Sequence, residues 1–210
     1  PEKAELLGEM DSDSNQILLK VAKVLKRQGN YHLASKKYTQ AGDKVKAMKC
    51  LLKSGDTKKV LYYAGVSRNR EIYVLAANYL QSLDWQNDGE LMKKIVEFYL
   101  KAKAYEQLSS FYDAYAQVEI DEYRDYDKAA DALRDAAKHL AKSKADGHDA
   151  MMRSLEARTE LVETFVRART LLAAGDVAEA TRLCERMIAD PRARAGASKG
   201  STQGSGWGSS

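Results

Sequence analysis

The residues of this 210-residue sequence that could carry out chemistry are few and far apart. Its three histidines, His32, His139 and His148, form no H-E-x-x-H pair, and none lies near either cysteine, Cys50 or Cys184. A structural zinc site needs four such ligands at short, regular spacings. The sequence therefore predicts no zinc site. Two cysteines in helix-like contexts indicate a reducing compartment and no disulfide framework.

A run of acidic residues is a second candidate, in this case for calcium binding. The run comprises Glu119, Asp121, Glu122, Asp125 and Asp127. It lacks the mid-loop glycine and the spaced ligands of an EF-hand. Acidic side chains near a helix N-terminus are favoured by the helix dipole, and we prefer that interpretation.

No catalytic motif emerges elsewhere in the sequence. G-x-G-x-x-G and phosphate-loop patterns do not occur, and nothing brings a nucleophile together with a base and an orienting group. We therefore predict no catalytic, cofactor-binding or metal-binding residues, and a protein that is not an enzyme.

The distribution of charge is more informative than these candidate sites. Residues 15–70 hold fourteen Lys and Arg against two acids, whereas residues 71–135 hold fourteen acids against seven Lys and Arg. Charged residues usually form solvated faces, but a segregated block also suits a protein-binding face that is steered by complementary potential. Our candidate basic face for protein binding comprises Lys20, Lys23, Lys26, Arg27, Lys36, Lys37, Lys44, Lys46, Lys49, Lys53, Lys58 and Lys59.

Nucleic acid and membrane are weaker partners for this basic block. Lysine outnumbers arginine in it, which disfavours base readout, and the acidic block that follows would repel a long polyanion. No helix pairs the lysines with a clean apolar exposed face, so we expect membrane contact to be indirect or secondary at most. No run of about 18 apolar residues is present, and no signal segment opens the chain. The chain begins without Met, which suggests a fragment of a longer protein.

The elements that must position these residues are predicted to be helices. The composition is 44% hydrophobic and 30% charged, and the only prolines are Pro1 and Pro191. A short pattern recurs, in which a glycine closes one helix, Asp or Asn caps the next, and Ala with an aromatic or aliphatic residue forms a buried seam. The copies begin at Gly29, Gly42, Gly55 and Gly175, with weaker copies at Ala104 and Asp125.

This pattern predicts an all-α fold, an irregular tetratricopeptide-like helical-hairpin array, or α-solenoid. We expect a lead-in from a longer chain over residues 1–14, the array over 15–190 and a flexible Gly/Ser-rich tail over 191–210. The twelve tyrosines are expected to pack between helices with their hydroxyls at the rim. The expected helices span residues 15–28, 31–41, 44–54, 57–64, 70–83, 90–102, 105–118, 126–143, 150–174 and 177–190.

Two stretches carry a family resemblance. Residues 18–85, which include QGNYHLASKKYTQAGDKVKAMKCLLKSGDTKKV, and residues 93–133 resemble the C-terminal repeats of large intraflagellar transport and coatomer-like subunits. They are most similar to the intraflagellar transport protein 140 family, which belongs to intraflagellar transport complex A. Members of that family carry N-terminal WD40 propellers followed by tetratricopeptide-like repeats, and this sequence shows only the repeats.

The resemblance implies a protein-interaction scaffold without catalytic residues or cofactors. It implies roles in retrograde ciliary transport, cilium assembly and ciliary entry of membrane cargo. The implied partners are other complex A subunits and cargo adaptors. The implied location is the cilium or flagellum and the basal body, on the cytoplasmic side.

Two alternatives share the repeat. One is a coatomer-type vesicle-coat subunit that acts at the Golgi. The other is a peptide-binding co-chaperone clamp, which needs an ordered Lys/Asn/Arg constellation within strict 34-residue repeats. The irregular spacing of the repeats argues against the clamp.

Overall fold

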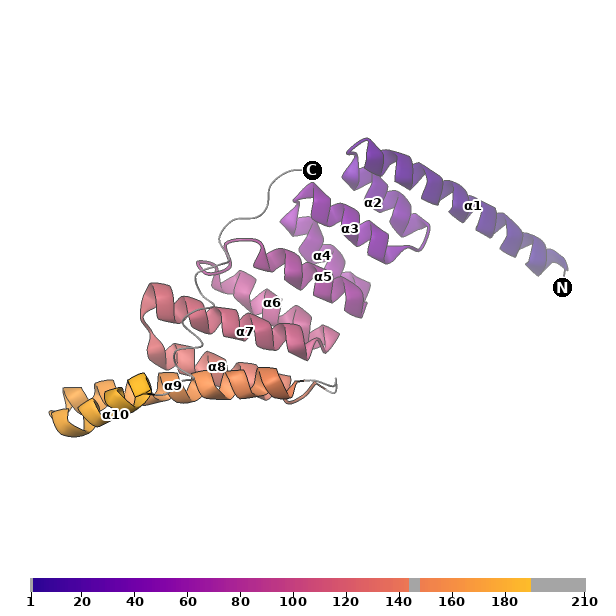
Figure 1. Ribbon diagram of the computed structural model, residues 1–210. Coiled ribbons are helices and arrows are strands. Elements are labelled where there is room, and N and C mark those ends of the chain that lie inside the picture. The colour runs from indigo at the N-terminus through magenta and orange to yellow at the C-terminus, as the bar shows by residue number, and fades with distance from the viewer. Residues whose placement is uncertain (1, 144–147, 190–210) are drawn as a thin grey trace. The chain divides into compact units, whose positions relative to one another are not determined.

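The computed structural model describes residues 2–143 and 148–189, with side chains from residue 13 onward within those ranges. The chain divides into two compact units, residues 1–104 and residues 105–210. The described residues of both units form helices joined by short turns, and none of them lies in a strand (Figure 1). The predicted all-α helical-hairpin fold is thereby confirmed. The predicted tail over 191–210 lies outside the described residues.

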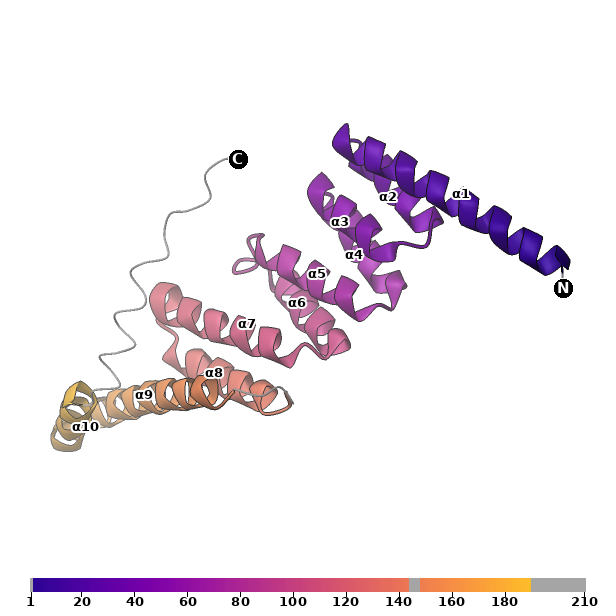
Figure 2. The ribbon, with the colours of Figure 1, turned by 45° about the vertical axis from the view of Figure 1, so that its right-hand side comes forward.

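The first unit is a row of antiparallel helices. In Figure 2, α1, α3 and α5 follow one another along one side, and α2, α4 and α6 alternate with them. Helix α2 packs between α1 and α3, α3 packs also on α5, and α5 pairs with α6. The helices are α1 (Glu2–Arg27), α2 (Tyr31–Gln40), α3 (Lys44–Ser54), α4 (Thr57–Ser67), α5 (Arg70–Gln81) and α6 (Gly89–Ala102).

The second unit places α8 between α7 and α9, with α10 returning along α9. Ion pairs tie α9 to its neighbours, because Arg158 contacts Asp113 of α7, and Arg134 of α8 lies 2.7 Å from Glu163. The elements are α7 (Tyr105–Val118), the π-helix η1 (Glu119–Tyr123), α8 (Tyr126–Leu140), α9 (Asp149–Ala173) and α10 (Val177–Ala189).

Small residues occupy the places where helices cross. In the first unit Ala22, Ala34 and Ala47 are fully buried and form one core with Tyr38 and Cys50. Alanine at a crossing lets two helix backbones approach closely while a larger neighbour fills the remaining space. The core of the second unit is also rich in alanine and comprises Ala116, Ala129, Ala130, Ala132, Leu133, Ala136, Leu140, Leu155 and Val162.

The four glycines at which the repeat copies begin are left-handed residues. Gly29, Gly42, Gly55 and Gly175 have φ between 70° and 88°. After Gly42, the backbone N–H of Asp43 donates back to the carbonyl of Tyr38 at 2.9 Å, as in a Schellman motif. This geometry reverses the chain within two residues, so the next helix begins at once.

The weaker copies keep the same backbone without a glycine. Lys103 and Arg124 have φ of 53° and 55°, and they precede the weaker copies that begin at Ala104 and Asp125. The N–H of Ala104 donates to the carbonyl of Tyr99, five residues back, at 3.0 Å, which repeats the bond seen after Gly42. After η1 the N–H of Asp125 reaches back six residues instead, to the carbonyl of Glu119 at 2.9 Å. The turn geometry therefore recurs along the array even where a side chain makes it less favourable.

Several expectations about helix ends were wrong, and α8, for example, ends at Leu140 rather than at residue 143. Helix α1 begins at Glu2 rather than Asn15, so residues 2–14, which were expected to be a lead-in, are part of the first helix. Helix α4 runs through Gly65 to Ser67 and ends at left-handed Arg68. The Asn30 side chain makes no capping hydrogen bond, whereas the aspartates at the following turns do.

The two glycines around α4 give a matched pair of substitutions. Gly55 has φ of +70°, Gly65 is helical, and a Cβ at either position would meet no atom within 4 Å. We expect Gly55→Ala to lower the free energy of unfolding by about 1 kcal/mol through backbone strain. Gly65→Ala should raise it by roughly 0.5–1 kcal/mol. Urea unfolding followed by circular dichroism measures both, and equal effects of the two variants would contradict the assignment.

Candidate protein-interaction surface

All twelve residues of the predicted basic face lie in the first unit, on α1 to α4. Eleven of them are exposed, and Lys37 is half-buried. Eight of them lie on α1 and α3, which follow each other along one side of the unit: Lys20, Lys23, Lys26, Arg27, Lys44, Lys46, Lys49 and Lys53. The other four lie on the alternating helices α2 and α4: Lys36, Lys37, Lys58 and Lys59.

Two of these lysines take part in helix capping. The Asp43 carboxylate accepts the backbone N–H of Lys46 at 2.9 Å and its Nζ at 2.5 Å. Asp56 binds Lys59 in the same way, at 3.1 and 2.8 Å. Burial alone would raise the pKa of Asp43, but the hydrogen bonds from Lys46 outweigh burial and hold that pKa below its usual value. Lys46 and Lys59 therefore stabilise helix starts as well as adding positive charge.

A third lysine is paired across helices. Lys49 Nζ lies 3.6 Å from Glu71 Oε1, and both side chains are more than half exposed. An exposed pair of this kind contributes little to stability and is readily exchanged for another partner. Within the described residues, no ion pair involves the remaining basic residues on α1 and α3: Lys20, Lys23, Lys26, Arg27, Lys44 and Lys53.

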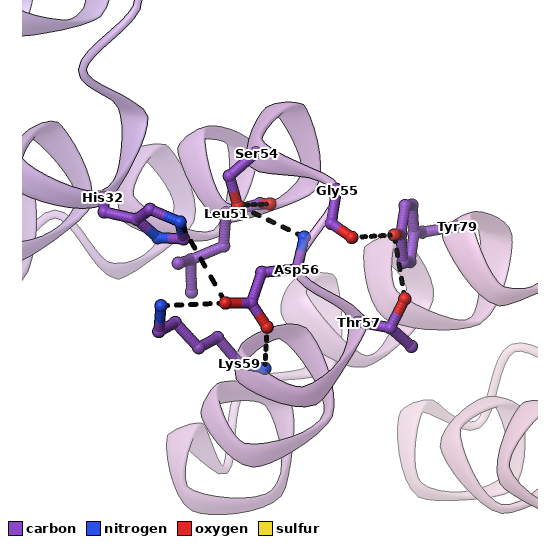
Figure 3. A network of polar contacts seen from close by, with 8 residues as sticks. All are labelled: His32, Leu51, Ser54, Gly55, Asp56, Thr57, Lys59 and Tyr79. Atoms are coloured by element: carbon purple, nitrogen blue, oxygen red, sulfur yellow. Dashed lines mark hydrogen bonds and ion pairs between the residues drawn. The ribbon is translucent and has the colours of Figure 1, made fainter.

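The turn between α3 and α4 is a meeting point for neighbouring helices (Figure 3). His32 on α2 reaches it, with Nε2 4.0 Å from Asp56 Oδ2. Tyr79 on α5 donates its hydroxyl to the carbonyl of Gly55 at 3.2 Å and shares a 3.1 Å hydrogen bond with Thr57 Oγ1. Lys59 lowers the pKa of Asp56, most strongly through the hydrogen bond from its side chain and next through the one from its backbone N–H. One turn thus joins four helices.

Tyrosine hydroxyls repeat this contact along the first unit. Tyr63 on α4 bonds to Thr39 Oγ1 at 3.2 Å and to the carbonyl of Lys44 at 3.4 Å, so it bridges the turn between α2 and α3. Tyr99 on α6 donates to Asn78 on α5 at 2.6 Å, and its burial raises its pKa to about 12. Tyr63 fits the expectation that tyrosines pack between helices with their hydroxyls at the rim. Tyr99 is instead buried, and Tyr62 is 72% exposed.

Removing one hydroxyl tests this contact. We expect Tyr79→Phe to lower the free energy of unfolding by roughly 0.5–1.5 kcal/mol, because the ring still packs while the bonds to Gly55 and Thr57 are lost. Tyr62→Phe is the matched control, and it should change the free energy of unfolding by less than about 0.5 kcal/mol. Thermal and urea unfolding of the two variants provide the comparison, and an unchanged Tyr79→Phe protein would show that the bonds contribute nothing.

The acidic run of the second unit serves structure at α8 and η1. Asp125 is the N-cap of α8 and accepts the N–H of Lys128 at 3.0 Å, and Asp127 lies in the first turn, as the preferred interpretation predicted. Glu119, however, is buried in η1, and its hydrogen bond and charge add to burial in raising the pKa of Tyr115. Within residues 13–143 and 148–189, no group of His, Cys, Asp and Glu is arranged to hold a metal ion.

The histidines and cysteines fall into separate environments. His148 lies before α9, with Nε2 3.2 Å from Glu106 Oε1 and 2.9 Å from Ser143 Oγ. Both cysteines are free thiols; Cys184 is exposed, whereas burial raises the pKa of the Cys50 thiol.

His139 is a buried group that the sequence alone did not single out. Its ring stacks on Tyr112 at 5.6 Å between centroids, and Nδ1 makes no hydrogen bond among the described residues. Burial, followed by the charge of Lys142, lowers the pKa of His139. Its spacing from Ala132 and Ala136 on α8 was the available signal, because it places the ring on the buried side of that helix.

The lowered pKa predicts a pH dependence of stability. The unfolded chain takes up a proton near the ordinary histidine value of about 6.5, whereas folded His139 resists protonation. The stability contribution of neutral His139 is therefore complete above about pH 6.5 and is lost as the pH falls through the lower folded pKa. His139→Phe should flatten the decline in unfolding free energy between about pH 7 and 5, whereas His32→Gln should not. An unaltered slope in His139→Phe would contradict this.

Comparison with known families agrees with the fold. Residues 2–98 match the family model for the TPR domain of intraflagellar transport proteins 140 and 172. Residues 106–200 match the C-terminal TPR domain of intraflagellar transport protein 140. The chain belongs to the C-terminal TPR region of the intraflagellar transport protein 140 family. The interval between the two matches contains the boundary at residues 104 and 105 that separates the two compact units.

Family membership gives the surface its context. TPR-type repeats are typically non-catalytic modules that bind other proteins, and membership in this family indicates a scaffold-like role in an intraflagellar transport subunit at the cilium. No helix among the described residues is both long and apolar enough to cross a membrane.

Proposed function

We propose that this chain is a non-catalytic scaffold in the C-terminal part of an intraflagellar transport complex A subunit. It acts in retrograde ciliary transport, cilium assembly and ciliary entry of membrane cargo. Its partners are other complex A subunits and cargo adaptors, on the cytoplasmic side of the cilium and at the basal body. The observation that carries the proposal is the pair of adjoining matches to this one family, which together run from residue 2 to residue 200.

The physical support comes from the first unit. Repeated helix pairs present side chains from successive helices at regular intervals, and such surfaces bind helices or extended peptides. The twelve basic residues lie on this unit, and most of them are exposed. A surface of that charge steers acidic partners and selects against basic ones. Both matches name domains of intraflagellar transport protein 140, which favours this function over that of a vesicle-coat subunit.

Charge reversal tests the basic face. We expect replacement of Lys36, Lys37, Lys44 and Lys46 by Glu in the full-length subunit to reduce capture of at least one complex A subunit about tenfold. The measurement is quantitative mass spectrometry of complexes purified from ciliated cells that lack the endogenous subunit. Circular dichroism of the 210-residue chain should show unchanged helicity.

The matched control makes four similar reversals on the second unit, at Lys138, Lys142, Arg153 and Arg167, all of which are exposed. It should leave the complex intact. Full recovery of every complex A subunit by the first variant would remove the basic face as a contact. Equal losses in both variants would indicate a general effect of charge.

A further inference from the structure

Helices α2 and α4 lie side by side and run in the same direction. Near their starts, His32 Nε2 on α2 lies 4.0 Å from Oδ2 of Asp56, the N-cap of α4 (Figure 3). Nearer their ends, Thr39 on α2 and Tyr63 on α4 share a 3.2 Å hydrogen bond. Because the two helices touch at both ends, the residues that they expose between these contacts form one surface.

The exposed side of these helices follows the internal repeat. A shift of 26 residues, the interval from Gly29 to Gly55, places α2 on α4. Three exposed positions recur on both helices at the spacing i, i+3 and i+7: Leu33 with Lys59, Lys36 with Tyr62 and Gln40 with Val66. Helix α4 packs against α3 before it and α5 after it, and this side of α4 stays exposed with both in place. The repeat therefore leaves this side open in both copies.

Apolar side chains and a glycine lie on this open side. Tyr62 is 72% exposed, Val66 is 58% exposed, and Leu33 on α2 is 51% exposed. Gly65 lies one turn after Tyr62, and a Cβ there would meet no atom within 4 Å. Glycine destabilises a helix relative to alanine, but it lets another chain approach the backbone closely. An exposed ring beside such a space suits an aromatic side chain, because aromatic pairs attract beyond the area that they bury.

Lysines surround these apolar side chains. Lys36 on α2 and Lys58 on α4 are exposed, and neither makes an ion pair among the described residues. Lys59 adds a third cation, although it binds Asp56 at 2.8 Å. Unpaired cations beside an apolar centre attract a segment that carries carboxylates and repel a basic one.

Other parts of this chain fit the surface less well. Residues 191–210 carry three basic residues and no acid, so their charge opposes docking beside Lys36 and Lys58. Many acids of a second copy are already bound within their own helix, as Asp131 is to Arg134. A separate protein with unpaired acids is the better match.

We propose that α2 and α4 together dock an acidic segment of a partner protein that carries an aromatic side chain. This docking surface, the α2–α4 face, comprises Leu33, Lys36, Lys58, Tyr62, Gly65 and Val66. The aromatic side chain packs on Tyr62 above Gly65, and carboxylates on either side of it bind Lys36 and Lys58. This rests on the proposed scaffold function and specifies the class of partner segment that one surface takes.

A photoreactive peptide tests the α2–α4 face on the whole 210-residue chain. The probe is a short fluorescent peptide with p-benzoylphenylalanine at its centre and glutamates on both sides. One control peptide carries lysine in place of each glutamate, and the other carries alanine in place of the aromatic residue. Fluorescence anisotropy should show the probe binding at least about tenfold more tightly than either control, with weaker binding at high salt. After irradiation, mass spectrometry should place the cross-link on α2 or α4.

Two double variants separate the α2–α4 face from general charge. Lys36→Glu with Lys58→Glu should weaken probe binding at least about tenfold. Lys20→Glu with Lys23→Glu makes the same change of charge at exposed lysines of α1. At physiological ionic strength, this control should leave binding within about twofold, because it lies on another side of the unit.

Substitution of Gly65 separates docking from stability. Gly65→Gln improves helix propensity but places a side chain on the α2–α4 face. The variant should therefore be more stable to urea and bind the probe at least about fivefold less tightly. Tyr62→Ala should weaken the probe and leave the alanine control peptide unaffected. Circular dichroism checks that all variants stay helical.

Several results would overturn the proposal. Three of them are equal loss in the two lysine variants, equal binding of the probe and its controls, and a cross-link outside α2 and α4. Binding by the 210-residue chain but not by the full-length subunit would show that the subunit itself covers this face. Sedimentation that shows dimers which Lys36→Glu with Lys58→Glu dissolves would assign it to a second copy. Binding to phosphatidylserine vesicles, with no probe binding, would assign it to lipid.

The outcome is separable from that of the scaffold function. If the probe fails to bind while the reversal at Lys36, Lys37, Lys44 and Lys46 still reduces subunit capture, only the α2–α4 face falls. If the probe binds as expected while that reversal recovers every subunit, the basic face falls as a complex A contact and the α2–α4 face stands.

Discussion

The array depends on how its chain reverses direction. At most of the described turns a left-handed residue ends one helix, and an Asp or Asn two residues or fewer later begins the next. The carbonyls of the first helix and the N–H groups of the second would otherwise be left without partners. Because the turn satisfies both sets within a few residues, consecutive helices must lie side by side, and their buried stripes must face one another.

Close packing then follows from the size of the side chains. Turns this short hold neighbouring helices together only if small residues lie at the crossings, and Ala22, Ala34 and Ala47 meet this need in the first unit. Tyrosine supplies the longer reach: Tyr63 and Tyr79 extend from one helix to the turn that begins two helices earlier. Alanine sets the spacing of the helices, and the tyrosine hydroxyls link each helix to more than its nearest neighbours.

Most helix positions could be predicted from sequence because the glycine and aspartate signals are local. The exceptions have physical causes. The sequence does not mark Arg68 as left-handed, since arginine is unfavourable there, and Gly65 gave a stop signal that the surrounding helix overrides. The sequence predicts which residues make up the basic face, but it does not show how those residues are placed on the surface. Only the fold shows that Lys46 and Lys59 engage capping aspartates and that the rest are divided between two rows of helices.

Lysines that already bind a capping aspartate differ from lysines without an ion pair in how readily they can bind an acidic partner. Lys46 already has a carboxylate 2.5 Å away, so a docking acid must compete with an intramolecular one. Lys20 occupies the equivalent place on α1, where residue 17 is Ile and the counterpart of Asp43 is therefore absent. The repeat of 26 residues, the interval from Gly29 to Gly55, thus places one cation against its own helix cap on α3 and leaves its counterpart on α1 without that carboxylate. Ile17, which stands where the repeat has Asp43 on α3, is the difference that leaves Lys20 without this intramolecular partner.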